Sequence, residues 1–96
     1  MPAIARIGDR DATHCSTPVR AQGSGDVFVN GRAACRVGDR NNVHLMPGGD
    51  SCVPHSAAIS SGSGTVFVNG VAVARVGDPV SGCTVVVQGS SNVFAG

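Results

Sequence analysis

The 96-residue chain is predicted to be a small all-β protein, built as three β-hairpins around a pseudo-threefold axis. Valine and glycine dominate, lysine and glutamate are absent, and the only leucine is Leu45, so strong helix formers are scarce apart from alanine. A sequence unit occurs twice in full, each time with an Asn-Gly pair at its centre, and a third copy is divided into two halves. These observations together favour hairpins over helices.

The repeated unit is clearest in the middle of the chain. "GSGDVFVNGRAACRVGD" at 23–39 aligns without gaps with "GSGTVFVNGVAVARVGD" at 62–78. A third copy is divided between the chain ends, with "GSSNVFAG" at 89–96 and "PAIARIGD" at 2–9. This copy can form only if the two ends lie side by side. We therefore expect adjacent termini and three equivalent elements closed around one axis.

Each complete unit consists of two extended runs joined by Asn30-Gly31 or Asn69-Gly70. Asn-Gly between two such runs is typical of a two-residue type I′ hairpin turn. The third hairpin would be open where the chain ends fall. Alternation places Phe28 and Phe67 on the face opposite to the neighbouring valines, and both faces are expected to be partly buried around the axis. The three phenylalanines, which include Phe94, are then expected to contribute to the core.

The Gly-Asp pair that follows each hairpin is expected to end its second strand. Glycine permits a positive φ, and the Asp carboxylate can accept hydrogen bonds from backbone N–H groups in the turn that it opens.

Length and charge exclude several classes of function. A chain of 96 residues holds one domain, and a net charge of +1 from scattered arginines gives no basic face for nucleic acid. No apolar run is long enough to span a membrane, and the N-terminal sequence has no secretory signal. We expect a protein that stays in the cytosol or leaves it by a route that needs no cleaved signal.

The three units carry a metal-ligating side chain at the same offset. Five residues beyond the Asp of each Gly-Asp pair stands a histidine or a cysteine, namely His14, His44 and Cys83. Under a threefold these side chains converge on the axis and leave the fourth vertex of a tetrahedron there. His55, in the one long spacer, is placed to fill it. Three nitrogens and one thiolate in a closed tetrahedron suit a structural Zn²⁺.

The remaining cysteines leave alternatives open. Cys15 and Cys52 each lie within three residues of a proposed ligand, so either is an alternative thiolate ligand, or the two pair as a disulfide. Cys35 aligns with Ala5 and Ala74 and is expected to be a small core residue.

A closed site predicts no catalytic residues and no enzymatic activity. A zinc hydrolase keeps an open coordination position and usually a glutamate base, and this chain has no glutamate. A disulfide-stapled secreted binding domain is the other alternative, and the missing signal peptide disfavours it.

At the N-terminus, "PAIAR" at 2–6 resembles the Pro-Ala-Ala-Arg motif of PAAR-repeat proteins, with Ile4 in place of the second Ala. The repeated "NG…ARVGD" and the set of three histidines and one cysteine are similar to the same family, over essentially the whole chain. The resemblance implies a small cone that caps the trimeric spike of a bacterial type VI secretion system, sharpening it for membrane puncture. It also implies one structural zinc near the tip, bound by His14, His44, His55 and Cys83.

The same resemblance sets expectations about partners and location. The chain, a monomer alone, would sit as one copy on each spike trimer, help to attach effectors or adaptors, and contact the target membrane transiently. Residues 1–96 would be a single PAAR-like domain with no fused effector extension. The protein would be cytoplasmic before assembly and exported with the spike without a cleaved signal peptide.

Overall fold

The computed structural model describes residues 1–48 and 51–96, without the side chains of 46–48 and 51–52. The described residues form no helix; their strands are short and pair antiparallel, two by two. The strands are β1 (Phe28–Val29), β2 (Arg32–Ala33), β3 (His44–Gly48), β4 (Ser51–His55), β5 (Phe67–Val68), β6 (Val71–Ala72), β7 (Pro79–Val80) and β8 (Thr84–Val85). None of the described segments is a helix long and apolar enough to cross a membrane.

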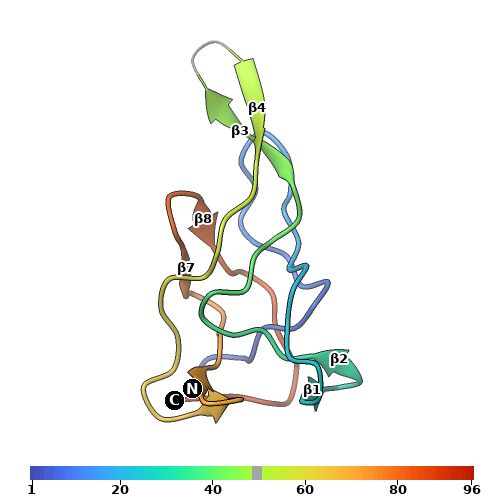
Figure 1. Ribbon diagram of the computed structural model, residues 1–96, viewed down its shortest axis with the longest axis vertical. Helices are drawn as coiled ribbons and strands as arrows, with labels where there is room; N and C mark the ends of the chain where they lie inside the picture. The colour runs from blue at the N-terminus through green and yellow to red at the C-terminus, as the bar shows by residue number, and fades with distance from the viewer. Residues whose placement is uncertain (49–50) are drawn as a thin grey trace.

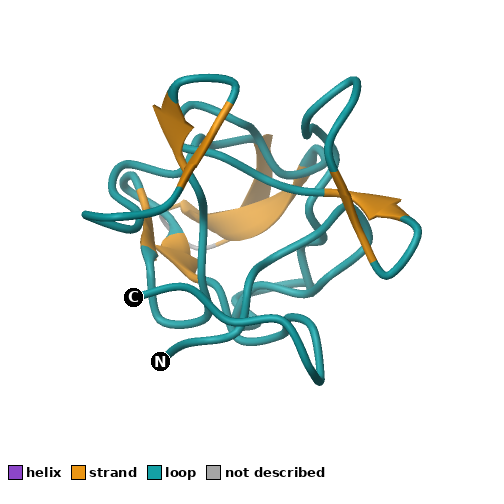
Figure 2. Ribbon diagram, turned by 90° about the horizontal axis from the view of Figure 1, so that it is seen from below, coloured by secondary structure: helices purple, strands orange, loops and turns teal. Residues whose placement is uncertain are grey.

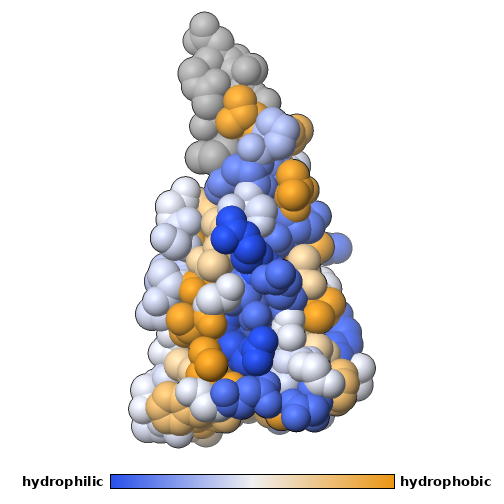
Figure 3. Space-filling view, viewed as in Figure 1, coloured by the Kyte–Doolittle hydropathy of each residue, from blue (hydrophilic) through white to orange (hydrophobic). Residues whose placement is uncertain are grey.

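The molecule is elongated and tapered, with principal extents of 40 × 23 × 21 Å. The pairs β1–β2 and β5–β6 and both chain ends lie at the broad end, called the base below, whereas β3 and β4 lie toward the narrow end (Figure 1). The space-filling view shows the same taper (Figure 3). The predicted all-β cone is therefore confirmed.

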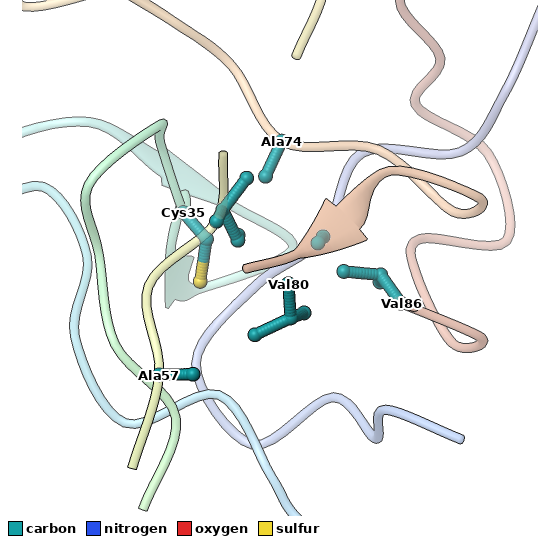
Figure 4. Close-up of a cluster of buried hydrophobic side chains, with 7 residues drawn as sticks. Cys35, Ala57, Ala74, Val80 and Val86 are labelled. Atoms are coloured by element: carbon teal, nitrogen blue, oxygen red, sulfur yellow. The ribbon is translucent and has the colours of Figure 1, made fainter. Parts of the chain in front are cut away.

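A closed ring of backbone hydrogen bonds marks the pseudo-threefold axis. The amide of Ala5 donates to the carbonyl of Ala74 (2.9 Å), Ala74 donates to Cys35 (2.9 Å), and Cys35 donates to Ala5 (3.0 Å). All three residues have no exposed surface. Three backbones that meet this closely leave room only for small side chains, which explains alanine or cysteine at this position. Figure 4 shows Cys35 and Ala74 within the buried cluster that also contains Val80.

The two chain ends complete the third hairpin. Phe94 pairs with Ala3 as Phe28 pairs with Ala33 in β1–β2, and the Ala95 amide donates to the carbonyl of Pro2 at 2.9 Å. The termini lie side by side when the base is viewed end-on (Figure 2). The split third copy of the repeat is thus a structural unit.

The two Asn-Gly turns have the backbone that the sequence predicts. Asn30 and Asn69 both have φ 54°, and the glycines after them have φ 77° and 76°. Two consecutive positive φ angles are the requirement of a type I′ turn, which asparagine followed by glycine meets at least cost.

The expectation that the phenylalanines contribute to the core was wrong. Phe28, Phe67 and Phe94 are 59%, 58% and 46% exposed, whereas Val29 and Val68, which follow the first two, are buried. Each hairpin turns only one face toward the core. No second layer of the described structure covers the other face, so the rings lie on the surface of the base.

The Gly-Asp turns are identical in construction. Each Asp carboxylate accepts from the backbone N–H and from the guanidinium of the Arg three residues before it; the pairs are Arg6–Asp9, Arg36–Asp39 and Arg75–Asp78. The intervening glycines Gly8, Gly38 and Gly77 have φ of 89°, 92° and 94°. Because the three turns match, the loops that follow them leave the core in equivalent directions toward the narrow end.

Candidate metal centre

Four side chains from different parts of the chain meet toward the narrow end. His14, His44, His55 and Cys83 each offer one ligand atom, and these atoms lie within 4.8 Å of one another. His44 opens β3 and pairs directly with His55 at the end of β4. Cys83 lies in the turn between β7 and β8, and His14 lies on the loop after the first Gly-Asp turn.

The sulfur of Cys83 is the centre of this group. The Nε2 atoms of His14, His55 and His44 lie 3.0, 3.1 and 3.2 Å from Cys83 Sγ, and those of His14 and His44 lie 3.1 Å apart. All three rings therefore point the same nitrogen into one small volume.

The backbone fixes which nitrogen His44 directs at the others. Its Nδ1 lies 2.7 Å from the carbonyl oxygen of Asn42, which can only accept, so Nδ1 carries the proton. In the neutral ring, Nε2 is then the nitrogen with the free lone pair, and it faces Cys83. An outer hydrogen bond that sets the tautomer in this way is typical of metal-ligating histidines.

Burial shifts the pKa values of His55 and Cys83. The pKa of His55 is lowered, mainly by desolvation and further by the nearby His44, His14 and Arg40. This shift favours the neutral imidazole, which is the form that binds metals. Burial also raises the pKa of Cys83, against the opposing effect of a hydrogen bond from Asn41. Without a cation the thiol keeps its proton more readily, so metal binding would displace that proton.

The donor set fits a four-coordinate metal ion. Typical Zn–N and Zn–S bonds in a tetrahedron give edges of about 3.3 Å between nitrogens and about 3.6 Å between nitrogen and sulfur. The three nitrogen–sulfur distances and the His14–His44 distance, 3.0 to 3.2 Å, are shorter than these edges by a few tenths of an ångström, up to about half an ångström. The widest separation within the group, up to 4.8 Å, involves His55 and is longer than an edge. The ion would be accommodated by moving the rings away from the sulfur and the His55 ring toward the other two histidines. All four vertices are protein atoms, as in structural sites.

A comparison with protein families identifies the chain. The model of the family described as PAAR motif matches residues 48–96. The chain belongs to the PAAR-motif family. The matched part of this PAAR protein carries His55, Cys83 and one complete repeat unit. A search of curated proteins found no match.

Sequence reasoning missed two hairpins of this PAAR protein. The sequence analysis assigns no strand to the long spacer that carries His55, but β3 and β4 pair there and place His55 opposite His44. Between the two strands the sequence carries Pro-Gly-Gly-Asp at 47–50, a composition typical of hairpin connections. The pair β7–β8 around Cys83 was also missed, and Ser81-Gly82 is its turn signal.

The cysteines divide into different roles. Cys35 and Cys83 are free thiols, and Cys15 is disulfide-bonded. The side chain of Cys52 lies outside the described residues, so the Cys15–Cys52 pair stays a prediction. Among the described residues, Cys83 is the cysteine that joins the three histidines.

Proposed function

We propose that this PAAR protein is a structural spike tip that caps the trimeric spike of a type VI secretion system, one chain per trimer. The observation that carries the proposal is the set of three exposed phenylalanines on the base. Phe28, Phe67 and Phe94 occupy the same position in the three pseudo-equivalent units and are each about half exposed.

The symmetry of these rings matches a threefold partner. Three identical subunits present the same surface at 120° intervals, and a base with three similar corners can meet all of them alike. Exposed aromatic rings are typical anchors of protein interfaces because each buries a large apolar area. One phenylalanine per spike subunit would anchor the cap.

Side-chain hydrogen bonds join the corners of the base into a belt. The Asn30 turn accepts from Ser90 Oγ at 2.5 Å, and the Asn69 turn accepts from Ser24 Oγ at 2.7 Å. Ser63 completes the belt by donating to the carbonyl of Gly96. Each hairpin is therefore bonded to the next unit. A base held in this way loses little freedom on docking.

The opposite end would carry one structural zinc ion held by His14, His44, His55 and Cys83. These ligands belong to separate chain segments, so the ion would stabilise the narrow end against unfolding. Closed coordination supports a non-enzymatic role. We further propose that this end contacts the target membrane transiently, and that the protein helps to attach effectors or adaptors. The protein would be cytoplasmic before assembly and exported with the spike without a cleaved signal peptide.

Native mass spectrometry of the chain mixed with a type VI secretion spike trimer tests the proposal. We expect one chain and one zinc ion on each trimer. A zinc-loaded chain that leaves the trimer bare would refute the spike role and preserve the metal site. A chain that takes up no metal from zinc-containing buffer would refute the metal site.

A further inference from the structure

We propose that Asn41 is a positioning residue for the metal-binding thiolate, because its side-chain amide directs an N–H toward Cys83 Sγ. The proposal rests on the metal site proposed above. Asn41 is not a ligand; it would act through Cys83, by holding the sulfur and drawing negative charge from it.

Asn41 belongs to a buried layer next to the site. Two residues beyond the Asp of each Gly-Asp turn stand Asp11, Asn41 and Val80, which are 1%, 3% and 2% exposed. Val80 packs in the apolar cluster with Cys35, Ala5 and Ala74, and Cys83 packs against the same cluster. These three pseudo-equivalent positions thus lie between the axial ring and the ligands, yet two of them are polar.

A second set of three equivalent buried positions also departs from the pseudo-threefold symmetry, and its one charged residue contacts Asp11. The amides of Gly8, Gly38 and Gly77 donate to the carbonyls of Arg20, Ile59 and Val86 at 2.8 to 2.9 Å, so these three residues are structurally equivalent. All three are buried. Ile59 and Val86 are apolar, whereas Arg20 is charged. The Arg20 guanidinium donates to Asp11 Oδ2 at 2.8 Å, and neither side chain is exposed.

The equivalents of Arg20 show that this fold accepts an apolar side chain at its position. Burying a charge pair costs desolvation energy that an apolar pair avoids. Packing alone therefore does not explain why Asp11 and Arg20 are charged. We look for a functional role of this ion pair among the residues that it contacts.

The network fixes the orientation of the Asn41 amide. Its Oδ1 accepts from the backbone N–H of Ala57 at 2.8 Å, which can only donate. Its Nδ2 donates to Asp11 Oδ2 at 3.0 Å, and an ionised carboxylate can only accept. The amide cannot flip without breaking both bonds. The second hydrogen of Nδ2 remains, and Cys83 Sγ lies 3.8 Å from that nitrogen.

The thiolate is the one anionic ligand of the four, and it is the one that faces this N–H. A hydrogen bond to a metal-bound sulfur lowers the energy of its lone pairs and fixes its direction. Asp11 and Arg20 would then serve to hold the amide, which gives the buried charges a function.

Asn41→Asp tests the inference with little change of shape. It retains an acceptor for the Ala57 N–H and removes the N–H that faces Cys83. With Co²⁺ as the probe, we expect the sulfur-to-cobalt charge-transfer band to move to longer wavelength. Zinc affinity, measured by chelator competition, should fall by about 10- to 100-fold, as for other outer-shell substitutions.

The matched control is Asn92→Asp, the same substitution at an exposed position of the base. Asn92 Oδ1 accepts from Asn30 Nδ2 at 2.9 Å, an acceptor role that aspartate keeps. The equivalent position of the first repeat unit already carries an aspartate, Asp26. We expect the wild-type band position and the wild-type zinc affinity.

A second variant conserves the charge of the network. Asp11→Asn combined with Asn41→Asp keeps one carboxylate bonded to one amide but turns an acceptor toward Cys83. It should shift the cobalt band in the same direction as Asn41→Asp. A wild-type band and zinc affinity in either variant would overturn the proposal.

If neither variant folds, the wild-type protein decides. In ¹¹³Cd-loaded, ¹⁵N-labelled protein we expect scalar coupling between the metal and an Asn41 side-chain amide proton, and its absence would overturn the proposal. Wild-type protein that binds no cobalt would instead refute the metal site itself. The two failures are therefore distinguishable.

Discussion

Replacing one phenylalanine of the base should weaken spike binding strongly and leave the fold intact. Phe67 is 58% exposed. A phenylalanine buries about 200 Å², so docking would cover about 110 Å² of this ring. At about 25 cal/mol per Å², that area stabilises the complex by about 3 kcal/mol. Phe67→Ala should therefore raise the Kd for the spike trimer by roughly 100-fold.

Titration calorimetry with the spike trimer measures this effect. Pseudo-threefold equivalence predicts that Phe28→Ala, which has the same exposure, has the same effect. Val43→Ala is the control, because Val43 is 71% exposed but lies next to His44, at the metal end. A wild-type Kd for Phe67→Ala, or an equal loss for Val43→Ala, would refute the docking face.

Two further predictions concern the metal end and the axis. His44→Ala should release zinc and lower the melting temperature by about 10 °C or more in calorimetry, with no further loss on adding a chelator. A variant that keeps its zinc and its melting temperature would contradict the ligand assignment. Cys35→Ala should change the free energy of unfolding by less than about 1 kcal/mol, because Ala5 and Ala74 fill the equivalent positions. Burial raises the pKa of the Cys35 thiol from 9.0 to about 12. Its contribution to stability is therefore fully present below pH 9 and is lost as the pH rises toward 12. The wild-type protein should lose stability relative to Cys35→Ala across that range, and a parallel pH profile of the two would count against the burial effect.

The hairpins could be predicted because their signals are local. A two-residue type I′ turn requires two positive φ angles, and Asn-Gly is the pair that adopts them most readily. The repeat then predicts the third hairpin at the chain ends. The exposure of the phenylalanines could not be predicted in the same way. Val27, Phe28 and Val29 are all apolar, so alternation marks two faces without showing which one the other units cover.

Part of the metal site could also be predicted from the repeat, and part could not. His14, His44 and Cys83 share one offset from Gly-Asp, so the repeat predicts that these three ligands meet, and His55 is the candidate for the fourth from the long spacer. Asn41 has the same offset as Asp11 and Val80, but three different residue types at one position give no signal of a common task. Its contacts with Cys83 and Ala57 depend on how separate loops pack, which the sequence spacing does not contain.

The chain ends permit a direct test of the threefold architecture. Phe94 pairs with Ala3 in the register of the other hairpins, so Gly96 and Met1 stand where those hairpins have Asn-Gly. Joining the ends with Gly96→Asn and Met1→Gly would create a third type I′ turn. Opening the chain between Asn69 and Gly70 would then give a circular permutant with its ends in an equivalent corner of the base.

We expect this permutant to bind one zinc ion and to unfold within about 2 kcal/mol of the wild type, since one two-residue turn is exchanged for another of equal length. The comparison is a permutant with the same joined ends, opened between Ser81 and Gly82 in the turn that carries Cys83. That opening frees a ligand from the loop that positions it, and zinc affinity should fall. Circular dichroism, chelator competition and denaturant titration measure both proteins. If the chain opened at Asn69 fails to fold while the chain opened at Ser81 folds and keeps its zinc, the three corners of the base are not equivalent and the threefold argument fails.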